Sequence, residues 1–68
     1  MTLEALIKQY ERLSEMSEKR GHMYYNDAED ARQKGNYESA MQYYNMASAA
    51  FNEATFYIEI VDDLNNVT

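Results

Sequence analysis

The stretch YESAMQYYNMASAAFNEATFYIEIV, residues 37–61, decides the fold of this chain. Its apolar residues follow one another at spacings that alternate between three and four, and neither proline nor glycine interrupts them. Such a heptad pattern is typical of a helix that packs nearly side by side with another helix. The contact seam predicted for this helix consists of Tyr37, Ala40, Tyr44, Ala47, Phe51, Ala54, Ile58 and Val61.

The preceding residues show the same rhythm around a polar middle that contains Ser17 and Arg20. The pattern therefore predicts a second long helix, whose middle is less regular than its ends. Its predicted seam residues are Leu3, Leu6, Tyr10, Leu13, Tyr24, Ala28 and Ala31.

A Gly35-Asn36 pair separates the two segments. Glycine suits the left-handed position just past a helix end, and asparagine suits the N-cap of the next helix. We therefore expect one all-α domain over residues 1–68, an antiparallel αα-hairpin with helices at about 3–34 and 37–65.

Residues equally far from the turn become neighbours in such a hairpin. Gly21 then falls opposite Phe51, so it either leaves room for that ring or breaks the first helix in two. The same register predicts ion pairs between the helices, which would favour the antiparallel arrangement. The expected pairs are Lys8 with Asp63, Arg12 with Glu59, and Lys34 or Arg32 with Glu38.

The chain has 68 residues and no cysteine. A domain of this size buries about 60% of its unfolded surface, so its core is marginal without further support. Apolar residues also remain beyond the seam, and one partner helix cannot cover them. We expect a homodimer that forms a four-helix bundle, with a host protein as a possible further partner on the same surface. The expected interface residues are Tyr43, Met46, Ala50, Tyr57, Ile60, Leu64, Met16 and Met23.

Enzymatic chemistry lacks its parts in this sequence. The single histidine, His22, follows Glu18 by one helical turn, and a metal site in a helical bundle needs several more ligands. Nucleophilic catalysis would need a second base, and a phosphate site would need a glycine-rich loop. We expect no catalytic residue, no metal and no cofactor, and hence a non-enzymatic protein-interaction module.

The charge balance argues against nucleic acid as a direct partner. There are twelve acidic and six basic residues, and all six basic residues precede the turn. Binding phosphates requires a basic face, which this distribution does not provide. No apolar run approaches the ~20 residues of a membrane span, so we expect a cytoplasmic protein that does not enter a membrane.

The acidic second half supports an alternative function. Carboxylates can occupy the positions of phosphates on a DNA-binding partner, so the chain could inhibit such a protein by mimicry. The residues that would carry this function are Glu53, Glu59, Asp62 and Asp63.

Residues 33–47, QKGNYESAMQYYNMA, resemble the turn and second helix of a tetratricopeptide repeat. The matching positions are Gly35, Asn36, Tyr37, Ala40, Tyr44 and Ala47. The turn also looks similar to that of the microtubule-interacting and trafficking domain, a three-helix bundle. Either resemblance implies an adaptor that binds other proteins.

Over the whole chain, the start MTLEALIKQYERL, the single Gly-Asn turn and the acidic IEIVDDLNN resemble another class. These are the small helical accessory proteins that lambdoid phages encode between their exonuclease and excisionase genes. The resemblance implies a non-enzymatic regulator that acts on host or lysogeny-related proteins, and it transfers no site residue.

Overall fold

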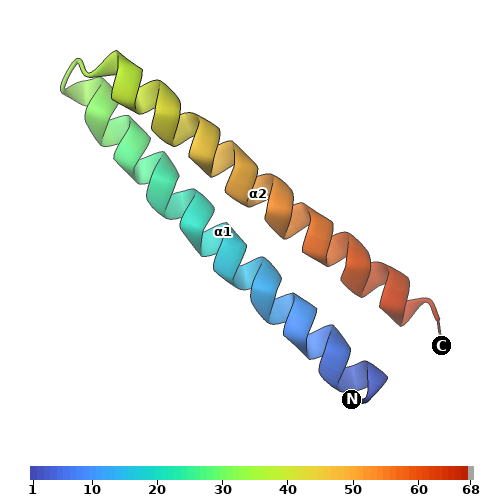
Figure 1. Cartoon of the computed structure of the whole chain (residues 1–68). Coiled ribbons are helices and arrows are strands. Elements are labelled where there is room, and N and C mark those ends of the chain that lie inside the picture. Colours follow the sequence, from blue (N-terminus) through green and yellow to red (C-terminus); the bar gives the residue numbers. More distant parts are fainter. Residues whose placement is uncertain (68) are drawn as a thin grey trace.

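The computed structural model describes residues 1–67, which form two long helices, α1 (Leu3–Gln33) and α2 (Tyr37–Asn65). The helices lie antiparallel along their whole length as a hairpin measuring 51 × 14 × 13 Å (Figure 1). The predicted all-α hairpin is confirmed, and α1 continues through Gly21 without a break. No helix in the described part of the chain is long and apolar enough to cross a membrane.

The turn is a Schellman motif built on Gly35. This glycine has φ of +79°, the left-handed conformation that L side chains rarely adopt. Its N–H donates to the Arg32 carbonyl at 3.0 Å, and the Asn36 N–H donates to the Ala31 carbonyl at 2.8 Å. Asn36 stands at the N-cap of α2 as predicted, but its side chain makes no capping hydrogen bond. The side-chain cap is at the other helix, where Thr2 Oγ1 accepts from the Ala5 N–H at 3.1 Å.

One half of the seam predicted for α2 is confirmed, and the other half is wrong. One of its two columns, which contains Ala40, Ala47, Ala54 and Val61, is buried as expected. The other column is shifted by one residue: Ala50 is 6% exposed, whereas Ile58 and Tyr37, predicted in the seam, are 45% and 70% exposed. Positions three and four residues after a seam alanine satisfy the heptad spacing equally well. The column with the smaller side chains, such as Ala50, faces α1 because it lets the two helices approach more closely. The second column is therefore Tyr43, Ala50, Tyr57 and Leu64, with Tyr44 and Phe51 half-buried beside it.

The polar middle of α1 belongs to the seam. Ser14 and Ser17 are 4% and 1% exposed, and Gly21 is buried between the helices. Small side chains, rather than apolar ones, occupy this part of the heptad, so the two backbones come close together. The seam of α1 thus runs unbroken through Leu3, Ile7, Tyr10, Ser14, Ser17, Gly21, Tyr24, Ala28 and Ala31. The predicted seam residues Leu6 and Leu13 are half-buried beside it.

Gly21 leaves room for the Phe51 ring, one of the two predicted roles. A Cβ atom on Gly21 would lie 2.6 Å from Phe51 Cε1, which is closer than real Cβ contacts. The same ring meets His22 edge-on, with the ring centroids 5.1 Å apart. Phe51 is therefore held between the backbone of α1 at Gly21 and the imidazole one residue later.

The predicted ion pairs between the helices are wrong. Lys8 pairs with Glu4 at 3.7 Å on its own helix, and Lys34 and Arg32 likewise find acceptors one turn earlier in α1. Acids at i−3 or i−4 lie on the same helix face and are reached without crossing the seam. Within residues 1–67, the ion pair that does cross the seam is Arg20 with Glu53, at 2.9 Å.

Candidate functional site

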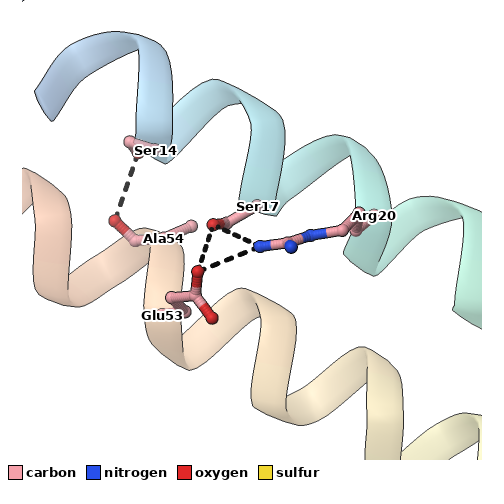
Figure 2. A network of polar contacts seen from close by, with 5 residues as sticks. All are labelled: Ser14, Ser17, Arg20, Glu53 and Ala54. Carbon is pink, nitrogen blue, oxygen red and sulfur yellow. Dashed lines mark hydrogen bonds and ion pairs between the residues drawn. The ribbon is translucent and has the colours of Figure 1, made fainter. Parts of the chain in front are cut away.

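A polar cluster lies at the middle of the hairpin, where the small residues bring the helices together (Figure 2). Ser17 Oγ donates to Glu53 Oε1 at 3.0 Å, and Arg20 Nη2 donates both to that oxygen and to Ser17 Oγ at 2.9 Å. One turn earlier, Ser14 Oγ donates to the Ala54 carbonyl at 3.1 Å. No buried side-chain polar atom in the described chain lacks a partner.

The cluster is organised to hold its charges rather than to react. The Ser17 hydroxyl first, and then the Arg20 guanidinium, keep the pKa of the Glu53 carboxyl below its usual value. A carboxylate stabilised in this way is a weak base, and the Ser17 proton is already donated to it. No group of three metal-ligating side chains occurs within residues 1–67. The arrangement therefore suits a structural role, pairing specific positions of the two helices.

The second polar cluster lies nearer the turn, where Tyr25 and Tyr44 pack edge-on with ring centroids 5.7 Å apart. Arg32 binds Glu29 at 2.8 Å and is the main reason that the pKa of this carboxyl is lowered. A hydrogen bond to Glu29 raises the pKa of Tyr25. These interactions join the helices beside the turn and leave the aromatic edges at the surface.

One side of the hairpin carries an apolar surface centred on the Arg20–Glu53 pair. Helix residues three, four or seven positions apart lie on one side, so the neighbours of this pair can be read from their numbers. We call this surface the methionine face, and it comprises Met16 and Met23 around Arg20, and Met46, Phe56 and Ile60 around Glu53. All but the half-buried Ile60 are exposed.

The predicted interface residues divide between this face and the hairpin seam. The prediction that Ala50 belongs to the interface is wrong, because Ala50 is buried against α1 and offers no surface to a partner. Tyr57 also turns inward, and its ring lies 5.9 Å from that of Tyr10. Of the residues predicted for the interface, Tyr43, Tyr57 and Leu64 are half-buried in the seam. The other four lie on the methionine face: Met16, Met23, Met46 and Ile60.

The predicted acidic surface loses one of its members. Glu53 accepts a hydrogen bond from Ser17 and forms an ion pair with Arg20, so its negative charge is largely compensated within the hairpin. Glu59, Asp62 and Asp63 remain exposed on α2.

The opposite side of the hairpin carries a shallow groove that sequence reasoning missed. From Ser17 in the seam, Glu18 lies about 100° around α1 in one direction and Arg20 about 60° in the other, so the groove and the methionine face flank the seam. The sequence signal is the row of residues 37, 44, 51 and 58, which the heptad pattern assigns to the seam. We call this surface the acidic groove; its lining residues are Ser14, Glu18, Phe51, Ala54, Thr55 and Ile58.

Comparison with known proteins returns no relative. No family model, no curated protein and no solved structure matches the chain.

Proposed function

We propose that this chain is a non-enzymatic protein-interaction module that works as a homodimer, in which two hairpins pair through their methionine faces into a four-helix bundle. The observation that carries the proposal is the group of exposed large apolar side chains on that face. Met16, Met23 and Phe56 are each more than half exposed, and aromatic residues and methionine are enriched in interface cores.

The exposed surface area of the hairpin supports a partner that covers about as much surface as a second copy would. The hairpin exposes 5155 Å². A compact monomer of the same mass exposes about 4,450 Å², so about 700 Å² is in excess. Each partner of a standard interface buries about 800 Å². One copy pairing with another would therefore remove the excess and give the single-layer hairpin a two-layer core.

The test is the sedimentation-equilibrium mass at micromolar concentration. The chain has a mass of 8.0 kDa, and we expect a species of about twice that mass. Met23→Asp should yield monomers because a charged, strongly hydrated carboxylate would replace an apolar side chain within the interface. Met41→Asp is the matched control, since both methionines are 64% exposed but Met41 lies away from the face.

Two outcomes would overturn the proposal. A wild-type chain that stays monomeric at these concentrations contradicts dimerisation itself. A dimer that Met23→Asp and Met41→Asp weaken equally contradicts the methionine face as its interface. Far-UV circular dichroism of both variants shows whether each remains helical.

A further inference from the structure

We infer that the acidic groove is a second interaction surface, which binds a basic amphipathic helix of another protein. It goes beyond the proposed dimer, because the groove flanks the other side of the seam and stays open when two methionine faces pair. The partner is defined by its chemistry: an apolar stripe with lysine or arginine along one edge.

The apolar part of the groove is a straight row on α2. Phe51 and Ile58 are seven residues apart, so they lie on one side of α2 about 10.5 Å from each other along its axis. Ile58 is 45% exposed, and Ala54 lies between them at the floor. A helix lying along this row would place its own residues i and i+7 on Phe51 and Ile58, since it has the same rise per residue.

The α1 wall of the groove carries the negative charge. Glu18 lines the groove, and Glu11 and Glu15 precede it by two turns and one turn on the same helix face. Within residues 1–67 neither Glu11 nor Glu15 has a cation within 4.0 Å, and Glu18 meets only His22 at 3.8 Å. These carboxylates attract cations on a partner helix and oppose an acidic one.

The chain's own cations offset this charge only in part. Lys8, Arg32 and Lys34 are paired within α1, and Arg20 is held by Glu53 on the other side. Arg12 lies with Lys8 in a separate hollow of α1. Lys19 lies beside Glu15 and Glu18 but makes no ion pair within 4.0 Å in the described chain, so one cation faces the three carboxylates. The groove therefore combines an apolar row with an edge of net negative charge, and the complementary ligand is an apolar stripe with a basic edge.

The test uses a labelled peptide of about 18 residues, five helical turns, with leucine at alternating three- and four-residue spacing and arginine along one flank. A second peptide carries glutamate in place of arginine. Fluorescence anisotropy should show that the basic peptide binds and that the acidic peptide does not. Added salt should weaken the binding because the carboxylates are exposed.

Matched variants locate the surface. Glu11→Gln/Glu15→Gln should weaken binding of the basic peptide by about 2- to 30-fold, the range expected for two exposed ion pairs. Glu38→Gln/Asp63→Asn removes the same charge from exposed positions of α2 away from the groove and should leave binding unchanged. Ile58→Ser should weaken binding at least about fivefold through lost apolar contact.

The results also separate this inference from the dimer. Met23→Asp should abolish the dimer and leave peptide binding intact, whereas the groove variants should do the reverse. Equal binding by wild type and Glu11→Gln/Glu15→Gln, or loss of binding in Met23→Asp, would overturn the assignment to the acidic groove. If the wild-type chain sediments with a mass above that of the dimer, and Ile58→Ser lowers this mass, another copy of the chain occupies the groove. That result would also overturn the inference.

Discussion

Replacing Gly21 by alanine sets two physical effects against each other. Glycine inside a helix costs about 1 kcal/mol relative to alanine, so helix propensity alone predicts that Gly21→Ala stabilises the chain. The hairpin predicts the opposite sign. The new Cβ would lie 2.6 Å from Phe51 Cε1 and 2.8 Å from two further atoms of the same ring.

The magnitude follows from the movement that the contact requires. Ordinary contacts of a Cβ begin at 3.4 Å, so the Phe51 ring must withdraw by about 0.8 Å, away from the seam or against His22. Overpacking of this kind costs about 1–3 kcal/mol. After the gain in propensity of about 1 kcal/mol, we expect a net loss of up to about 2 kcal/mol, and each kcal/mol lost lowers the Tm by about 4–8 °C in a domain of this size.

A double-mutant cycle with Phe51→Ala isolates the contact. Without the ring, Gly21→Ala should stabilise the helix by about 1 kcal/mol, so its sign should reverse between the two backgrounds. The assay is thermal unfolding followed by far-UV circular dichroism at one fixed protein concentration, because dimerisation makes Tm concentration-dependent. If Gly21→Ala raises the Tm while Phe51 is present, the close packing inferred here is refuted.

Three further substitutions test the seam and its polar cluster. Ala50→Asp should cost about 3 kcal/mol or more by burying an unpaired charge, whereas Ile58→Asp should cost less than about 1 kcal/mol because the side chain is nearly half exposed. Ser17→Ala should cost about 1 kcal/mol in urea unfolding, since it removes a buried hydroxyl that joins Arg20 to Glu53. The folded-state pKa of Glu53 lies below its usual 4.5, so its contribution is present above that pH and is lost as the pH falls through the folded value. Glu53→Gln should therefore make stability fall less steeply below about pH 4.5.

Each of these has a control at an exposed position of α2. Ser48→Ala removes a hydroxyl from an exposed helix position and should not destabilise the chain. Glu59→Gln should leave the acid dependence as in the wild type. Equal costs for Ala50→Asp and Ile58→Asp would contradict the seam described here, and an unchanged acid slope in Glu53→Gln would contradict the role of the cluster.

Local rules were sufficient for the hairpin itself. A left-handed position demands glycine, and the heptad rhythm on either side of Gly35 indicates two packed helices, so the turn and the helix ends could be predicted. The choice between Ala50 and Phe51 could not, because both satisfy the spacing and the shape of the partner helix decides. The exposed methionines of the candidate interface were predictable, because Met16 and Met23 fall outside the predicted seam of α1.

The polar residues of the seam were harder to place than the apolar ones. Hydrophobic patterning treats serine as a surface residue. Ser17 is nevertheless the most deeply buried polar side chain of the described hairpin, because it is small and its hydroxyl donates to Glu53 across the seam. The predicted ion pairs between the helices were wrong because a closer partner was overlooked. A cation such as Lys8 finds an acid one turn away on its own helix, and a register argument between helices does not weigh that competition.

The three-residue link between α1 and α2, residues 34–36, has a consequence for how the hairpin forms and opens. Seam contacts beside the turn join residues close in sequence, whereas those at the far end close a loop of nearly the whole chain (Figure 1). The entropy of loop closure rises in the same direction, so pairing begins most cheaply at Gly35 and extends outward. Fraying proceeds in reverse, and the Ser17–Arg20–Glu53 cluster stands midway along that path. Amide exchange should then be slowest between the turn and this cluster and fastest toward the open end.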